Sequence, residues 1–111
     1  MKTGAELIAE ERKRQIEVED WTPEHMEMMN GQMAVAGACY ALGTAEIISN
    51  EDNAWKEQYG ISATGFWPWD DEWYKPTPQD PIRQLTKAGA LIAAEIDRLQ
   101  RYLRLQEKWY V

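Results

Sequence analysis

A long apolar pattern in the last third of the chain constrains the fold more than any other feature. Asp80 and Pro81 open it with a common helix start, a capping side chain followed by a proline in the first turn. The apolar residues then follow at alternating spacings of three and four: Ile82, Leu85, Gly89, Ile92, Ile96, Leu99 and Leu103. The opposite face carries Arg83, Lys87, Asp97, Arg101 and Arg104. This pattern predicts a long amphipathic α-helix.

The beginning of the chain predicts another helix. Thr3 and Glu6 have the spacing of a capping box, and we expect the helix to run from there to about Glu19. Its apolar residues form only a thin stripe, so we expect it to lie on the surface. A pair such as Glu10 and Arg14, four residues apart, would stabilise it there.

Thr22-Pro23-Glu24 predicts the start of a further helix. We expect Asn30-Gly31 to interrupt that helix briefly. From Gln32 to about Ser49 the pattern resumes with apolar residues on two faces, which is typical of a central, buried helix. The small residues that would let another helix approach it closely are Gly37, Ala38 and Ala41.

The residues from about 50 to 79 form a long irregular stretch that is rich in tryptophan and proline. The prolines argue against a regular helix there. A chain of 111 residues corresponds by size to one domain. We therefore predict a single all-α domain, residues 1–111, with three principal helices, in which an aromatic-rich loop joins the second helix to the third.

The composition limits the classes of function. A net charge of −7 disfavours direct nucleic-acid binding, because phosphates would repel the chain, and suits a partner with a basic surface. No apolar run approaches the roughly 20 residues that a membrane span needs, and the N-terminus lacks a signal-peptide pattern. We therefore expect a cytoplasmic protein.

The single cysteine and the single histidine do not form the common zinc arrangements, and we expect neither a metal nor another cofactor. Cys39 lies in an apolar run, which favours a small buried side chain over a reactive thiol.

The segment from Phe66 to Tyr74 is the most unusual part of the sequence, because it places three acids among five aromatic rings. It is open to three interpretations: a protein-recognition surface, a stacking site for a flat ligand, or a plug that fills a gap between helices. Its candidate binding residues are Trp67, Trp69, Asp70, Asp71, Trp73 and Tyr74. The acidic run within it is more typical of a solvated loop than of a metal site.

Elsewhere in the chain the candidate binding residues are Arg12, His25 and Met29. Arg12, or Arg14 beside it, would bind a phosphate. For His25 a structural or capping role is favoured over a general base, because no nucleophile stands at an interpretable distance from it. The plausible carboxylate cluster comprises Glu6, Glu10, Glu11 and Glu95. For these acids a structural ion pair is favoured over a ligand role.

Several blocks of the sequence resemble a family of short, uncharacterised phage and prophage proteins. The blocks are Glu6 to Gln15, Trp21-Thr22-Pro23-Glu24-His25, Gly31, Ala38 to Ala41, Trp67-Pro68-Trp69, Trp73 to Pro76 and Leu85 to Leu99. The resemblance covers most of the chain except about residues 43 to 65, and it implies a phage accessory protein. The portion from Glu11-Arg12 to Trp21-Thr22 also resembles the RyR domain, a helical module linked to nucleotide-type ligands.

The chain departs from the family pattern Glu-His-Asp-Asp-x-His-x-x-Gly-Glu-Leu-Ala. Met26 and Met29 stand in place of an Asp and a His, and Gln32 replaces a Glu. If the family uses those groups for a metal or a proton transfer, this member has lost most of them. The replacements create an adaptable apolar patch comprising Met26, Met28, Met29 and Met33.

Three hypotheses of function follow. The first is a non-enzymatic phage protein that inhibits a host defence component by binding it, a hypothesis that rests on the small size, the acidity, the aromatic loop, the methionine patch and the lost polar positions. The second is a binder of a small nucleotide-like ligand or signal. The third is a nucleotide pyrophosphohydrolase of the MazG kind, which ranks last because the central helix lacks the paired carboxylates. In each case we expect a homo-oligomer.

Overall fold

The computed structural model describes residues 1–26, 29–48 and 63–110. Within these ranges the α-helices are α1 (Gly4–Glu17), α2 (Gln32–Ile48) and α4 (Pro81–Tyr110), and two short 3-10 helices are η2 (Ala63–Phe66) and η3 (Asp71–Trp73). The described part contains no strand. The all-α prediction with three principal helices is confirmed. Of the predicted loop, about residues 50–79, the part up to residue 62 lies outside the described residues.

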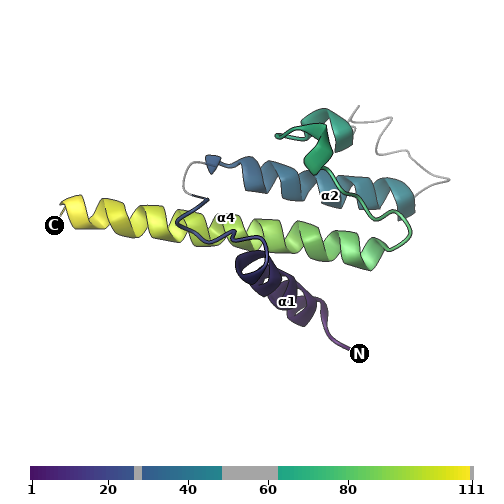
Figure 1. Cartoon of the computed structure of the whole chain (residues 1–111), viewed down its shortest axis with the longest axis horizontal. Helices are drawn as coiled ribbons and strands as arrows, with labels where there is room; N and C mark the ends of the chain where they lie inside the picture. The colour runs from purple at the N-terminus through teal and green to yellow at the C-terminus, as the bar shows by residue number, and fades with distance from the viewer. Residues whose placement is uncertain (27–28, 49–62, 111) are drawn as a thin grey trace.

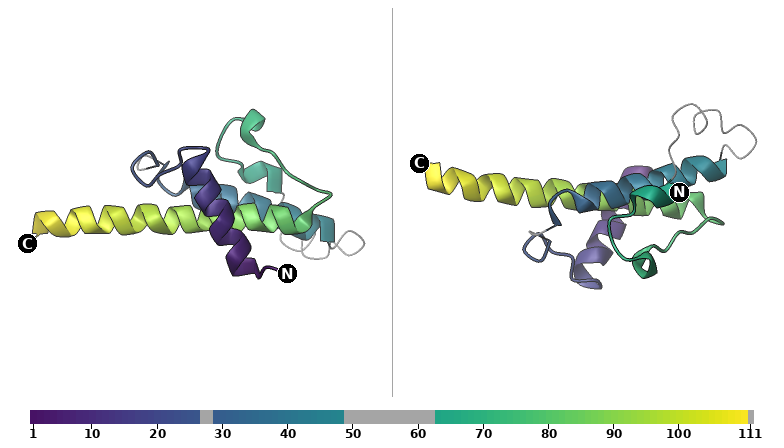
Figure 2. Two further views of the ribbon diagram at one scale, coloured as in Figure 1. Left: turned by 60° about the horizontal axis from the view of Figure 1, so that its bottom comes forward. Right: turned by 90° about the horizontal axis from the view of Figure 1, so that it is seen from above.

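The long helix α4 is the axis of the molecule. Figure 1 shows α2 running antiparallel along one side of α4, while α1 crosses α4 steeply. The views in Figure 2 show that the C-terminal half of α4 extends well beyond α2. A helix of 30 residues is about 45 Å long, which accounts for most of the 55 Å long axis of the molecule.

The capping box at the start of α1 is confirmed. The Glu6 amide donates to Thr3 Oγ1 at 3.2 Å, and the Thr3 amide donates to Glu6 Oε1 at 3.1 Å. The expectation that α1 lies on the surface was wrong for one face, which buries Glu11, Arg12 and Gln15 against α4. Polar side chains are buried at moderate cost where ion pairs and hydrogen bonds compensate the lost solvation.

The ion pairs of α1 differ from the predicted one. Glu10 pairs with Lys2 at 2.7 Å. Arg14 instead contacts Glu11 at 2.5 Å and Glu19 at 3.1 Å. Arg14 therefore turns toward the buried carboxylate of its own helix rather than toward solvent.

The helix predicted from Thr22 was wrong, because residues 23–26 form only a turn and α2 begins at Gln32. Asn30 and Gly31 have φ angles of 34° and 86°, in the left-handed region that ends a right-handed helix. What was expected to be a brief interruption is thus a complete boundary. The C-terminal end of α2 at Ile48 agrees with the expected position.

The close helix contact predicted at Gly37 is confirmed. A Cβ atom at Gly37 would lie 3.0 Å from the Ala88 carbonyl oxygen and 3.1 Å from Ile92 Cγ1. Ala38, by contrast, is exposed and takes no part in that contact. Gly89 makes a second close approach, because a Cβ there would collide with Ile8 of α1.

The core between the helices is small. Its buried members are Met26, Met33, Ala36, Tyr40, Ala88, Leu91 and Ala94. The predicted apolar face of α4 is not part of it: Ile82, Leu85, Ile92, Ile96, Leu99 and Leu103 are all exposed. The face that α4 buries includes Gln84, Ala88, Leu91 and Arg98 instead. The helix was predicted correctly, but the face it turns inward was not.

Two further features complete the fold. Cys39 is fully buried, as expected, and its burial raises the pKa of the thiol. None of the described helices combines the length and the apolar content that crossing a membrane requires.

Candidate functional site

The aromatic segment packs on α2 around the ring of Tyr40. Trp67 meets that ring edge-on, with 5.5 Å between centroids, and Tyr74 lies at 5.4 Å. Trp67 in turn contacts Trp69 at 5.4 Å in an edge-to-face arrangement. Aromatic rings attract one another in these geometries. The segment is therefore held to the core by its own rings, as the plug interpretation proposed for it.

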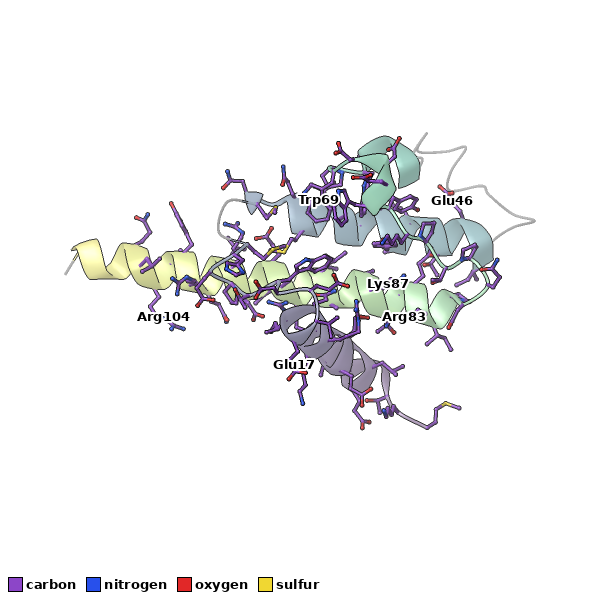
Figure 3. All side chains as sticks on the ribbon, in the orientation of Figure 1. Glu17, Glu46, Trp69, Arg83, Lys87 and Arg104 are labelled. Atoms are coloured by element: carbon purple, nitrogen blue, oxygen red, sulfur yellow. The ribbon has the colours of Figure 1, made fainter. Side chains whose placement is uncertain are left out.

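Hydrogen bonds fix the orientation of these rings. Trp67 Nε1 donates to the Asp70 carbonyl oxygen at 3.1 Å, and Trp69 Nε1 donates to Gln32 Oε1 at 3.0 Å. The Lys75 amide donates to the Tyr40 hydroxyl at 3.1 Å. Figure 3 shows Trp69 beside α2, where the aromatic segment packs on that helix. Because both indole N–H groups are engaged within the protein, the ring faces and edges are what remains for a ligand.

The packing leaves an open cleft of about 480 Å³. It lies between the chain that precedes α2, the aromatic segment and the α2–α4 pair. Its lining comprises Trp21, Met26, Met29, Tyr40, Trp67, Pro68, Trp69, Asp70, Trp73 and Leu91. Trp73 is 57% exposed and stands at the rim. A mostly apolar concavity of this size with few polar groups is typical of a small-molecule site.

A smaller hollow of about 120 Å³ adjoins the cleft and shares four of its walls, Trp21, Tyr40, Trp73 and Leu91. It differs from the cleft in that its remaining lining residues are polar or charged. Its other lining residues are Arg14, Gln15, Glu19, Lys75 and Lys87. The two hollows together therefore offer aromatic surface on one side and cationic groups on the other.

The cations of the hollow are close enough to affect one another. Burial lowers the pKa of Lys87, and neighbouring Arg83, Arg14 and Lys75 lower it further. Lys87 Nζ donates to the Lys75 carbonyl oxygen at 2.9 Å and lies 5.7 Å from the centre of the Tyr40 ring. Figure 3 shows Lys87 and Arg83 on the same stretch of α4.

Carboxylates neutralise these cations unevenly. Arg14 is paired with Glu11 and Glu19. Among the described residues no ion pair is formed by Lys75 or Lys87. In a chain with a net charge of −7, two lysines beside an aromatic cleft are available to an anion.

Gln15 adds a neutral polar group to the same hollow. Its side chain is 2% exposed, and its Oε1 atom has no hydrogen-bond donor in the part of the chain that the structure describes. A buried amide oxygen normally has a partner. A hydroxyl or amino group of a ligand in the hollow would supply one.

The structure brings five of the predicted site residues together at the cleft: Trp67, Trp69, Asp70, Trp73 and Met29. Tyr74 supports the cleft from behind, through its contacts with the rings of Tyr40 and Trp67. Asp71 is exposed at the start of η3 and is not part of the lining. Met26 and Met33 of the predicted methionine patch belong to the core, and Met28 lies outside the described residues.

Arg12 and His25 lie apart from the cleft. Arg12 is buried, with Nε 3.2 Å from Asp97 Oδ2 and Nη1 donating to the Trp21 carbonyl oxygen at 2.9 Å. It joins α1, α4 and the chain before α2, and so positions Trp21 rather than facing the hollow. His25 is exposed, with Nδ1 2.9 Å from Asp20 Oδ2.

The acids singled out from the sequence are separated in space. Glu11 contacts Arg14 and Arg83, and Glu95 contacts Arg98, so the two buried carboxylates have different cationic partners. Over residues 1–26, 29–48 and 63–110, no group of three histidine, cysteine, aspartate or glutamate side chains is placed to hold a metal ion.

Several residues of the site were not predicted from the sequence, chiefly Trp21, Tyr40, Lys75, Lys87 and Leu91. A usable signal existed for two of them. Lys75 directly follows Trp73 and Tyr74, and Lys87 stands four residues before Leu91, one helical turn away on the same face. Tyr40 and Trp21 gave no such signal, because only the tertiary packing brings them to the aromatic segment.

Comparison with known proteins does not extend this picture: no family model, no curated protein and no solved structure matches the chain.

Proposed function

We propose that the protein is a non-enzymatic binding protein whose aromatic cleft and adjoining basic hollow hold a small nucleotide-like ligand. The observation that carries this proposal is that the aromatic cleft and the basic hollow share four lining residues and therefore adjoin each other. A ligand lying across both would contact aromatic rings at one end and cationic groups at the other. A nucleotide has the matching pair of parts, a flat base and an anionic phosphate.

The base would stack in the cleft. Trp73 at the rim and the rings of Trp67 and Trp69 offer large aromatic faces, and stacking of a base on such a ring contributes about 1–3 kcal/mol. Asp70 lines the same cleft. Its carboxylate oxygens accept hydrogen bonds, so it would favour a base that carries an exocyclic amino group.

The phosphate would lie in the basic hollow. Lys75 and Lys87 supply ammonium donors that no carboxylate in the described residues neutralises, and charge-assisted bonds to phosphate are about twice as strong as neutral ones. Glu19 in the same lining would oppose a highly charged polyphosphate. We therefore expect a ligand with one or two phosphate groups to bind more tightly than a triphosphate.

A thermal-shift screen against mononucleotides, dinucleotides and cyclic nucleotides tests the proposal. Ligand at about 100 times its dissociation constant stabilises the folded state by roughly 2.7 kcal/mol. We expect a saturable shift with a nucleotide and a much smaller one with the matching nucleoside. If every nucleotide left the melting temperature unchanged, the proposal would be wrong.

Two matched pairs of variants connect the shift to the cleft. Trp73→Leu should weaken binding at least tenfold, while Phe66→Leu, which also replaces an exposed aromatic ring but outside the lining, should not. Lys87→Gln should weaken nucleotide binding, while Lys13→Gln on the exposed side of α1 should not. Equal effects within either pair would contradict the proposed placement.

A second candidate function is protein recognition, in which the chain inhibits a host component. The cleft is open, and Trp73 and Phe66 remain 57% and 48% exposed beside it, as anchors for a peptide or a loop would be. A pull-down from host lysate distinguishes the two. A stable partner that Trp73→Leu abolishes, together with a flat nucleotide screen, would favour this second function. The described residues offer no carboxylate cluster in support of a MazG-like hydrolase.

A further inference from the structure

The large aliphatic side chains of α4 point away from the core of the chain. The exposed residues form one line, named the α4 stripe: Ile82, Leu85, Ile92, Ile96, Leu99 and Leu103. They are between 43% and 66% exposed. The face that α4 turns toward α2 instead presents alanines and Leu91. On α4, six of the large aliphatic side chains are therefore exposed while Leu91 is buried.

The spacing of the α4 stripe is that of a helix–helix seam. Its members follow one another by three and four residues, with Gly89 completing the series where Ile8 of α1 packs. A repeat of 3.5 residues is the pattern by which two helices interdigitate side by side. Ile8 of α1 packs at Gly89, but the stripe residues on either side of it, Leu85 and Ile92, remain exposed.

The uncharged surface continues from α4 onto α2. Gly37 of α2 contacts Ile92 of the stripe. Ala34, three residues before Gly37 and on the same helical face, is exposed, as is Val35. The α2 sequence from Gln32 to Ala45 contains no charged residue. The exposed side of the α2–α4 pair is therefore apolar across both helices.

The C-terminal arm of α4 contacts the chain before α2 on one side, where Arg101 Nη1 lies 3.4 Å from Glu24 Oε1. Leu99, Tyr102 and Leu103 in this C-terminal part of α4 are exposed, and Figure 1 shows that the helix extends beyond α2. An isolated helix of this length is marginal in water, and most helical stability comes from packing an apolar face. A contact along the stripe would supply that packing.

We infer that the α4 stripe is a self-association surface, covered by the α2–α4 pair of a second copy of this chain to complete a four-helix bundle. Charge argues for a second copy. The chain carries a net charge of −7, and two copies would repel each other unless they met through a face without carboxylates. The six stripe residues are themselves uncharged, and acidic residues lie beside the stripe at its N-terminal end, where Glu10 and Asp80 share a hollow with Ile82.

The available area agrees with this occupant. Six aliphatic side chains, each about half exposed, present roughly 600 Å², so a two-fold contact would bury on the order of 1,200 Å², the lower end of the range for specific interfaces. In a dimer with two-fold symmetry the same patch of both copies is in contact. The stripe suits such a contact because its residues are uncharged and evenly spaced. This inference is independent of the aromatic cleft, whose lining includes no stripe residue.

Sedimentation equilibrium of the full chain tests the inference. One chain has a mass of 12.9 kDa, and we expect a mass of two or more chains at micromolar concentration. Ile96→Glu and Leu99→Glu should each shift the protein to the monomer. Val18→Glu is the matched control, since Val18 is 70% exposed and lies outside the stripe, and it should leave the mass unchanged.

Circular dichroism of the same samples shows whether the glutamate variants remain helical. A wild-type mass of one chain at all concentrations would overturn the inference whether or not the variants fold. The inference would also be overturned if the wild type associated and both glutamate variants, still helical, had the same mass as the wild type. Another surface would then hold the copies together. A monomeric wild type that captures a different protein through the stripe would assign the surface to that partner.

Discussion

Replacing Gly37 by alanine tests the helix contact on which the cleft is built. Two effects of opposite sign compete. Alanine favours the helix over glycine by about 1 kcal/mol. The added Cβ, however, would lie 3.0 Å from the Ala88 carbonyl oxygen and 3.1 Å from Ile92 Cγ1. The carbonyl belongs to the backbone of α4, so it cannot move aside unless the whole helix shifts.

The steric effect should win. Overpacking a well-fitted contact costs about 1–3 kcal/mol, so the net loss for Gly37→Ala is about 1 kcal/mol. For a domain of about 100 residues this lowers the melting temperature by roughly 4 °C. Because α4 also supplies Leu91 to the floor of the cleft, its displacement should weaken ligand binding as well.

Thermal unfolding followed by circular dichroism measures the change, at one fixed protein concentration because association would shift the midpoint. Gly4→Ala is the control, since nothing lies within 4 Å of a Cβ at Gly4, and we expect no loss of stability there. If Gly37→Ala raised the melting temperature as Gly4→Ala does, the helices would not be in close contact at this position, and the reasoning would be refuted.

Three further outcomes follow from the structure. Thr3→Ala should lower the melting temperature by a few degrees. Hydrogen bonds from Thr3 hold the pKa of Glu6 below its ordinary 4.5, so their stabilisation is present at neutral pH and is lost as the pH falls through that lowered pKa. The difference in melting temperature between Thr3→Ala and wild type should therefore become smaller in acid. Lys87→Gln should keep or raise the melting temperature measured at neutral pH. Burial lowers the pKa of Lys87, so its positive charge destabilises the folded state until the pH rises through that pKa. A large loss of stability in Lys87→Gln would contradict this. Cys39 is buried and its thiol pKa is raised, so a thiol reagent should label it only after unfolding, and rapid labelling of the native protein would show that the α2 packing is wrong.

Local signals in the sequence were enough to predict α1 and α4. Asp80-Pro81 marked the start of α4, and Thr3 with Glu6 marked that of α1, because caps and first-turn residues act within a few positions of the chain. The boundary at Gly31 was underestimated. The sequence shows that glycine permits a left-handed φ, but only the structure shows that the chain adopts it.

The faces of the helices were harder to predict than the helices themselves. The spacing of Ile92, Ile96 and Leu99 indicates that one face of α4 is apolar, but not which molecule covers it. The first helix was expected on the surface because its apolar stripe is thin, although ion pairing allows polar residues such as Glu11 and Arg12 to be buried. Such partners come from residues far along the chain, as Arg83 does for Glu11.

The candidate site was predicted in part for the same reason. The aromatic segment stands out in the sequence because Trp67, Trp69 and Trp73 lie so close together. Lys75 and Lys87 gain their role only when the turn before α4 brings them together, with Lys87 Nζ 2.9 Å from the Lys75 carbonyl oxygen. No spacing rule connects two lysines in different elements.

The most direct test of the proposed function is a titration of the ¹⁵N-labelled protein with a nucleoside monophosphate, followed through the indole N–H signals. Those signals can be assigned with single Trp→Phe variants. The account predicts that the signals of Trp67, Trp69 and Trp73 shift together and saturate, and that Lys87→Gln weakens the response. If these three signals stayed unchanged at millimolar nucleotide, the cleft would not be a nucleotide site and the central claim would be contradicted.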